Sequence, residues 1–136
     1  MDLKEKIVKN KEVFLEKNKL YGILSDELLK YLGEDLFTAP ASTMKSLHNA
    51  FPGGLVGHIL KTTKYAIGIN KLLPENLSAD AHSIVRVCFL HQIGKTFLYK
   101  WNESEWHRNN QGKMYEFNED LVSMRVGERS IYYATK

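Results

Sequence analysis

The sequence predicts a mainly α-helical domain with a small β-hairpin, built as a single unit of 136 residues. Apolar residues recur at helical spacing over most of residues 3–92. A short aromatic-rich region, residues 101–117, follows them and is typical of paired strands. The chain has no internal repeat and no long linker, and its length suits one hydrophobic core. We therefore expect residues 1–136 to form one domain.

Two amphipathic helices are expected within residues 1–33. The first, over residues 2–18, carries an apolar stripe among lysines and glutamates, and Asp2 can cap its N-terminus. The second, over residues 20–32, is expected to end at Gly33, because glycine is common just beyond a helix C-terminus. These two helices lead into the part of the chain that carries the polar motifs.

Residues 35–54 are expected to be mostly irregular, because they contain two prolines and the pair Gly53–Gly54. A long helix is expected next, over residues 55–73, where apolar side chains share one side and Pro74 ends the pattern. The short connection that follows favours an antiparallel neighbour for this helix.

The next helix, over residues 79–92, is expected to lie at the centre of the fold. Ser78 is a good N-cap for it, and its apolar side chains surround it almost completely. In the hairpin that follows, the sequence Asn-Asn-Gln-Gly at 109–112 is typical of a turn between strands. A last helical segment is expected from Gly127 or Glu128 onward.

Composition and charge narrow the class of function. The formal net charge is only +3, and basic and acidic residues alternate along the chain, which gives little support for nucleic acid as a partner. No apolar stretch is long enough to cross a bilayer, and the N-terminus lacks the apolar segment of a signal peptide. The single cysteine, Cys88, lies in an apolar run and has no intramolecular disulfide partner. We expect a cytoplasmic protein that does not associate with membranes.

Several polar side chains are expected to converge at one edge of the helical body. His58 lies in the N-terminal turn of one apolar helix and His91 in the C-terminal turn of the next, so antiparallel packing brings the two ends together. His48 and Lys95 can reach the same edge. Converging imidazoles suit a transition metal, and a lysine beside them suits the charge of a phosphate.

A purely structural interpretation of the same residues stays open. A histidine at a helix C-terminus, followed closely by glycine, is an ordinary arrangement that interacts well with the helix dipole. Nothing here has the tight spacing of a zinc finger or of a His-Glu-x-x-His motif. Spacing alone therefore does not decide between a metal site and a helix end.

Four ordered motifs resemble one family. They are LFTAPASTMKSLHNAFPGGLVGH at 36–58, FLHQIGK at 89–95, the aromatic hairpin, and VGERSIYY at 126–133. Together they resemble the HD superfamily of metal-dependent phosphohydrolases, and most closely its short phage and bacterial members. The resemblance covers residues 36–133 and implies an HD-domain-like helical bundle with a β-hairpin insertion.

The resemblance also implies roles for individual residues. In the family, the positions of His58, His91 and Gln92 are metal ligands, and a later aspartate on a C-terminal helix completes the site. Lys95 matches a lysine near the substrate phosphate, and His48 matches a histidine usual in this subgroup. In an active enzyme Arg129 would join Lys95 in neutralising phosphate, while His48 would assist proton transfer.

Three departures from the family pattern argue against catalysis. Gln92 stands where the family has aspartate, and a neutral amide binds divalent cations less well than a carboxylate. Val126 stands where related short proteins have histidine. We also expect the C-terminal helices of the family, with the last metal-binding aspartate, to be missing. At most His58 and His91 remain as strong ligands.

No resident cofactor is therefore expected. The alternative is a weakly held divalent metal: two imidazoles would hold Zn²⁺ or Ni²⁺ weakly, and Mg²⁺ or Mn²⁺ hardly at all, because these hard cations prefer oxygen ligands. Without a bound metal the family's route to an activated water is lost.

The function that we expect is a degenerate, catalytically inactive HD domain that binds a protein or a nucleotide, in a phage-type setting within the bacterial cytoplasm. The alternative is a metal-dependent phosphohydrolase acting on nucleotides or nucleic-acid ends, of which this chain is an altered or shortened form. A metal and turnover assay separates the two.

A protein partner or a homodimer is expected, because missing helices would leave apolar faces uncovered. The candidate contact residues are the aromatic side chains of the hairpin, Trp101, Trp106, Tyr115 and Phe117. The alternative for these side chains is structural, since aromatic cross-strand pairs stabilise hairpins without any partner.

Overall fold

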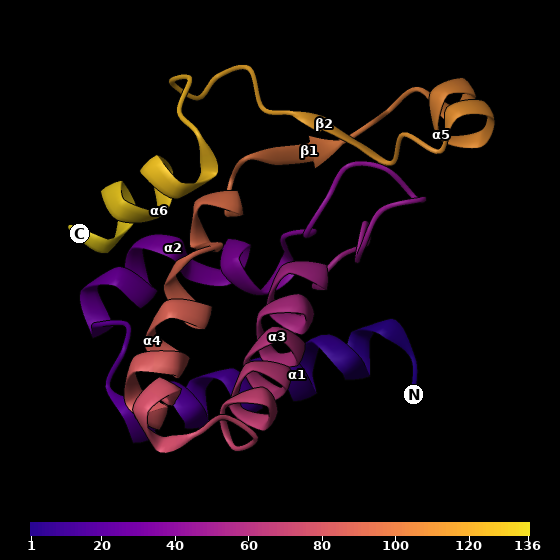
Figure 1. Ribbon diagram of the computed structural model, residues 1–136. Coiled ribbons are helices and arrows are strands. Elements are labelled where there is room, and N and C mark those ends of the chain that lie inside the picture. The colour runs from indigo at the N-terminus through magenta and orange to yellow at the C-terminus, as the bar shows by residue number, and fades with distance from the viewer.

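Six α-helices and one two-stranded antiparallel sheet form the fold in the computed structural model, which describes residues 1–136 (Figure 1). The helices are α1 Leu3–Tyr21, α2 Asp26–Thr38, α3 Gly54–Asn70, α4 Ala81–Leu90, α5 Glu105–Gln111 and α6 Val126–Ala134. The strands are β1 Tyr99–Trp101 and β2 Tyr115–Phe117, and the 3-10 helices are η1 Glu75–Leu77 and η2 Ile93–Lys95. The predicted class, mainly α-helical with a small hairpin, is confirmed. None of the helices has the length and apolar character needed to cross a bilayer.

Helix α1 begins at the residue that the sequence indicates. The Asp2 carboxylate accepts a hydrogen bond from the backbone N–H of Glu5 (2.8 Å), and the Glu5 carboxylate accepts one from the N–H of Asp2 (3.0 Å). This reciprocal capping box satisfies two N–H groups that a helix end leaves unpaired. The helix ends at Tyr21, beyond the expected end, where Gly22 adopts a left-handed conformation with φ of 62°.

Helix α2 differs from the prediction at both ends. It begins after Ser25, whose hydroxyl accepts a hydrogen bond from the Leu28 N–H (3.1 Å), so the expected start at residue 20 is wrong. Gly33 does break the helix, with φ of 58° and ψ of −151°, but helical structure resumes and reaches Thr38. The expected helix end at Gly33 is therefore a kink, because burial of Leu36 and Phe37 beyond it outweighs the break.

Two asparagines close the connections between consecutive helices. Buried Asn18 accepts a hydrogen bond from the Leu24 N–H (2.7 Å) and donates one to the Leu24 carbonyl (3.0 Å), which joins α1 to α2. Asn70 does the same with Ala79 between α3 and α4, at 2.8 Å for each bond. One amide side chain thus pairs with both polar backbone groups of a residue in the following connection.

Helices α3 and α4 pack against each other as antiparallel neighbours joined by η1 (Figure 1). Helix α3 ends at Asn70, three residues before the expected end. Helix α4 is capped by Asp80, whose carboxylate accepts a hydrogen bond from the Ser83 N–H (2.9 Å), and the expected cap at Ser78 is wrong. The Asp80 carboxylate also accepts a hydrogen bond from the Ser83 hydroxyl (2.8 Å), so two hydrogen bonds fix it at the start of the helix.

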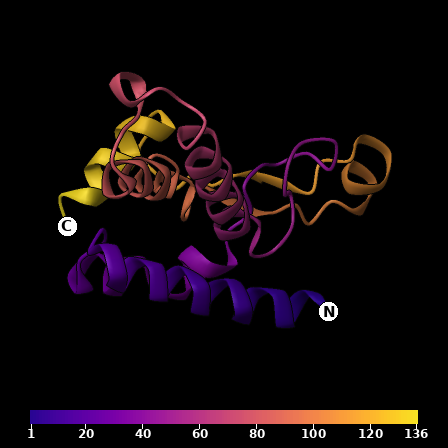
Figure 2. The ribbon, with the colours of Figure 1, turned by 60° about the horizontal axis from the view of Figure 1, so that its bottom comes forward.

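The hydrophobic core lies where α1 crosses α3 and α4. Figure 2 shows α1 running along one side of the molecule, across the other helices. Phe14 is fully buried there, stacked on Phe89 of α4 with ring centroids 4.4 Å apart and an interplanar angle of 10°. The edge of Phe37 completes the aromatic group, with its centroid 5.8 Å from that of Phe14. The apolar partners around it are Leu24, Leu28, Leu32, Leu36, Leu55, Val56, Ile59, Val85, Ile93 and Tyr133.

The hairpin extends away from the helical body, and its connection differs from the prediction (Figure 1). The strands pair in register, with Tyr99 opposite Phe117 and Trp101 opposite Tyr115. A short helix, α5, joins them in place of the turn expected at residues 109–112. Gly112 is the left-handed C-cap of that helix, with φ of 65°, so its conformation is turn-like although its role is to end a helix.

Backbone hydrogen bonds attach the loop between α2 and α3 to the hairpin. The Lys45 N–H donates to the Gly112 carbonyl (2.7 Å), and the Met114 N–H donates to the Thr43 carbonyl (2.9 Å). Met44 and Lys113 form an isolated antiparallel bridge between these contacts. Loop and hairpin therefore form a continuous patch of paired backbone.

Helix α6 docks on η2 through a glycine and a serine. The Ser130 hydroxyl donates to the His91 carbonyl (3.0 Å) and accepts from the Gly94 N–H (2.9 Å). A Cβ atom on Gly94 would lie 2.3 Å from the Val126 carbonyl oxygen and 2.8 Å from the Ser130 nitrogen. Only glycine allows this close approach of the two backbones.

Removal of the Phe14 ring tests the aromatic centre of the core. The Phe14→Ala variant is expected to lose about 3–5 kcal/mol of unfolding free energy, because the substitution leaves a cavity that rigid neighbours cannot fill. Urea denaturation followed by circular dichroism measures the loss. The control is Val8→Ala on the same helix, where the side chain is 56% exposed and a change within about 0.5 kcal/mol is expected. Equal effects of the two variants would contradict the assignment of the core.

A second prediction concerns the docking of α6. Gly94→Ala is expected to destabilise the fold by about 1–3 kcal/mol, since the backbone of α6 must shift to admit the methyl group. In Gly127→Ala the added Cβ meets no atom within 4 Å, and this matched variant is expected to be neutral or more stable by up to about 1 kcal/mol. Thermal unfolding of both variants checks the pair. An unaffected Gly94→Ala protein would show that α6 does not pack as described.

Candidate functional site

The imidazole rings of His48 and His58 lie against each other. Their centroids are 4.5 Å apart, and the rings are inclined by 40°. His58 belongs to α3, while His48 belongs to the loop between α2 and α3. The ring of His58 is partly buried and the ring of His48 is exposed, so the pair is open to solvent on one side.

Short polar contacts hold the loop that carries His48. The Ser42 hydroxyl donates to the His48 carbonyl (2.6 Å), and the Ala41 N–H donates to the Asn49 carbonyl (3.0 Å). Asn49 adopts a positive φ of 50°, and its side-chain amide donates to the Gly54 carbonyl at the start of α3 (3.1 Å). The backbone of His48 is therefore fixed from both sides, while its ring stays accessible.

Lys95 contributes a partly buried ammonium group to the same region. Its Nζ donates to the carbonyl of Ala41 (2.6 Å), in the loop that carries His48. Burial lowers the pKa of Lys95. The two ion pairs in the structure are Lys11–Glu34 and Lys100–Glu116, so Lys95 has no carboxylate partner.

His91 and Gln92 lie where α4 passes into η2. His91 caps the helix, is exposed, and has its Nδ1 atom 2.9 Å from the Cys88 carbonyl. The side-chain oxygen of Gln92 is buried and has no hydrogen-bond partner. We call His48, His58, His91 and Lys95 the basic cluster, because each contributes a titratable nitrogen and none of them is paired with an acid.

The electrostatics of the basic cluster are those of like charges held together. Burial is the main cause that lowers the pKa of His58 below its ordinary value of 6.5, and the charges of His48, Lys95 and His91 lower it further. Burial and the charge of Lys95 also lower the pKa of His48. The positive charges therefore oppose protonation of neighbouring rings. A bound anion would reduce this repulsion.

The residues present do not fit the divalent metal that the resemblance implies. No group of three or more His, Cys, Asp or Glu side chains is placed to hold a metal ion. The available donors are the imidazoles of His58 and His91 and the neutral amide of Gln92, with no carboxylate. Magnesium and manganese prefer several oxygen ligands, and the positive charge of Lys95 opposes any cation. The donor set favours an anion.

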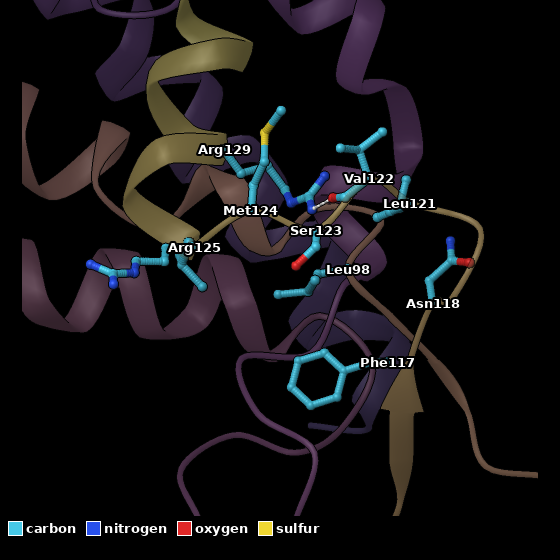
Figure 3. Close-up of a pocket in the computed structure, with 10 residues that line it drawn as sticks. Leu98, Phe117, Asn118, Leu121, Val122, Ser123, Met124, Arg125 and Arg129 are labelled. Atoms are coloured by element: carbon cyan, nitrogen blue, oxygen red, sulfur yellow. Dashed lines mark hydrogen bonds between the residues drawn. The ribbon is translucent and has the colours of Figure 1, made fainter.

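Arg129 lies apart from the basic cluster. It is on α6, is buried, and lines a separate pocket with Leu98, Phe117 and Val122 (Figure 3). Its charge is not among those that shift the pKa of His48 or His58. No hydrogen bond joins Arg129 to Lys95, and their pairing on one phosphate, which the sequence suggested for an active enzyme, stays a prediction.

The aromatic residues of the hairpin divide into two groups. Tyr115 is buried, with its ring edge against Trp101 at 5.4 Å between centroids. Trp101, Trp106 and Phe117 are exposed by 46%, 60% and 61%. The Arg108 guanidinium covers the Trp101 ring at 4.9 Å from its centroid. Tyr115 thus closes the hairpin, whereas the other three aromatic side chains remain available on the surface.

Several residues that shape the site carry no clear signal in the sequence. Ser42 and Asn49 hold the loop, and Ser130 holds α6, through hydrogen bonds to backbone carbonyls. These hydrogen bonds lie outside any regular helical or strand pattern, or join residues far apart in the sequence. Asn49 is the one with a recognisable property, since asparagine adopts positive φ more readily than most residues. Sequence patterns report periodic burial, and these three contacts are not periodic.

Comparison with known proteins identifies no relative of this chain. The chain matches no protein-family model, no curated protein and no solved structure at a significant level. The resemblance of residues 36–133 to the HD superfamily therefore stays a prediction. What the chain can bind has to be inferred from the basic cluster and from the pockets of the fold.

The lowered pKa values of His48 and His58 predict how stability depends on pH. In the unfolded chain both histidines titrate near their ordinary value of about 6.5, so as the pH falls below it the unfolded state takes up protons first. Stability is therefore expected to be retained above about pH 7 and to fall between pH 7 and 5. Urea denaturation at pH 7.5 and 5.5 measures the difference.

The variant His58→Gln should lose less stability between these pH values than the unaltered protein. His82→Gln is the matched control, because His82 is an exposed histidine at the start of α4, outside the basic cluster. If both variants keep the full pH dependence, the coupling within the basic cluster is not its source.

Proposed function

We propose that this chain is a non-catalytic, HD-like module that binds the phosphate group of a nucleotide at the basic cluster. One observation carries the proposal: the paired rings of His48 and His58 lie within the electrostatic reach of Lys95, with no acidic side chain to neutralise them. Converging nitrogen donors without a counter-charge suit the oxygens of a phosphate.

The charges explain why an anion is the favoured ligand. Burial and the charge of Lys95 oppose protonation of both imidazoles, and the charge of His48 adds to this at His58, so the pKa values of both rings lie below their ordinary value in the free protein. A phosphate would reverse the sign of this interaction and raise the affinity of both rings for protons. Binding would therefore be accompanied by proton uptake, and would be tighter at pH 6 than at pH 8.

The absence of a suitable set of metal ligands favours binding without turnover. Phosphoester hydrolysis in the HD manner requires a metal to lower the pKa of the attacking water. Gln92 offers an amide where a carboxylate is needed, and the remaining strong ligands are two imidazoles. The basic cluster can hold and orient a phosphate, but it lacks the group that would activate a nucleophile.

The geometry also favours a nucleotide over a protein as the primary ligand. The basic cluster brings side chains from the His48 loop and from the end of α4 within electrostatic reach of His58, and packing of the core does not require this. Exposed aromatic side chains such as Trp101, Trp106 and Phe117 are common on protein surfaces, and the cross-strand pairs of Trp101 and Phe117 stabilise the hairpin.

Calorimetric titration with adenosine monophosphate in the presence of EDTA tests this proposal. The unaltered protein should bind, Lys95→Gln should bind at least about tenfold more weakly, and Lys61→Gln, a nearby exposed lysine, should change affinity less. Sulfate, whose charge is constant between pH 6 and 8, should bind more tightly at pH 6, because the proton uptake that accompanies binding is easier there.

An enzymatic assay covers the alternative. Incubation with bis(p-nitrophenyl) phosphate and Mn²⁺ should release no product. Turnover that disappears in His91→Ala would contradict a non-catalytic function, and a chain that binds neither adenosine monophosphate nor sulfate would contradict the phosphate site.

A further inference from the structure

Arg129 is a buried cation without an anionic partner. Its side chain is on α6, and the residue is 4% exposed. One terminal nitrogen donates to the backbone carbonyl of Val122, and the Nε atom has no hydrogen-bond partner (Figure 3). A guanidinium carries five N–H donors and is always charged near neutral pH, so most of its binding capacity is unused.

The acidic and polar groups closest in the chain do not compensate Arg129. The carboxylate of Glu128 accepts a hydrogen bond from the Arg125 N–H (3.0 Å) at the start of α6. Tyr133, one helical turn further on, is a neutral hydrogen-bonding neighbour of Arg129: burial raises the pKa of its hydroxyl, Arg129 lowers it in part, and the hydroxyl donates to the Thr96 carbonyl (3.2 Å). Both ion pairs of the structure are elsewhere, so only neutral groups face the guanidinium.

A cavity of about 400 Å³ adjoins this guanidinium. Its volume is within the range of small-molecule sites. Between β2 and α6 its apolar lining residues are Leu98, Phe117, Leu121, Val122, Met124 and Val126. Figure 3 shows the guanidinium lying among these side chains and directed toward Val122, while Arg125 extends away from them.

The cost of burying the charge of Arg129 indicates which ligand the cavity would favour. A buried charge is costly unless a partner compensates it, and a carbonyl oxygen and a neutral phenol are weak partners for a guanidinium. A carboxylate would supply a full negative charge and oxygens that match the planar N–H donors. The lining is mainly apolar and would accept a hydrocarbon chain; its polar members besides Arg129 are Asn118, Ser123 and Arg125.

We propose that the cavity between β2 and α6 binds a small carboxylate with an apolar body, whose charged end pairs with Arg129. The hydrocarbon part lies against Leu98, Leu121 and Met124, and the mouth is formed by Val122 and Phe117, which are 71% and 61% exposed. This site is separate from the basic cluster, so it is independent of the proposed nucleotide function.

Titration of ¹⁵N-labelled protein with octanoate, followed by NMR, tests the proposal. Saturable shifts are expected for the Arg129 Nε–H signal and for backbone amides of residues 117–129. 1-Octanol has the same hydrocarbon chain without the charge, and it should bind at least tenfold more weakly. Equal affinities for octanoate and octanol, shifts confined to other parts of the chain, or no saturable binding would each overturn the proposal.

Variants separate the charge from the cavity. Arg129→Gln keeps an amide donor but removes the charge, and its preference for octanoate over octanol should fall at least tenfold. Because replacement of a buried residue can unfold the chain, Val122→Asp gives a second test: it places a negative charge at the exposed mouth and should weaken octanoate binding several-fold while sparing octanol.

Val87→Asp is the matched control for the mouth variant. Val87 lies on α4, is 66% exposed, and does not line this cavity, so the same change of residue and charge should leave octanoate affinity unaltered. Equal weakening of octanoate binding by Val87→Asp and Val122→Asp would show that only the net charge of the protein matters, and would overturn the assignment to this cavity.

Discussion

The stacked rings of Phe14 and Phe89 are the contact on which the rest of the structure depends. The stack fixes α4 across α1, and α4 leads directly into His91 and η2. The position of Lys95 and the platform for α6 follow from that crossing, because Gly94 and Ser130 join η2 to the last helix. An apolar contact in the core thus determines where two sets of positive charge lie.

These two sets use positive charge in different ways. In the basic cluster, imidazoles and an ammonium group lie partly exposed, and the mutual repulsion is reduced because the histidines can give up their protons. Arg129 has no such release, since a guanidinium does not titrate in the relevant range. Charge in the cluster therefore responds to pH and ligand, whereas charge in the cavity is permanent.

The sequence predicted the features that depend on local chemistry. The mainly helical class and the Asp2 cap followed from periodicity and from the hydrogen-bonding capacity of one carboxylate. The errors lie where distant contacts override a local signal. Gly33 was expected to end a helix that burial carries on to Thr38, and the polar run before Gly112 forms α5, where a turn was expected.

The candidate site was predictable in part. Antiparallel packing of two apolar helices is enough to place His58 and His91 at one end of the body. The isolation of Arg129 was not predictable, because nothing in its neighbours' identities indicates that the chain folds a cavity around it. A cavity forms where side chains from several segments leave space unfilled, and the hydrophobic periodicity of one segment does not reveal such a space.

The paired backbone between the His48 loop and the hairpin has a mechanical consequence. Thr43 and Lys45 are bonded to Met114 and Gly112, and the same loop reaches His48 only a few residues later. The hairpin projects from the body (Figure 1), and its Trp101 and Trp106 side chains are exposed. Because these bonds join the two segments, a displacement of the hairpin would strain the loop that positions an imidazole of the basic cluster.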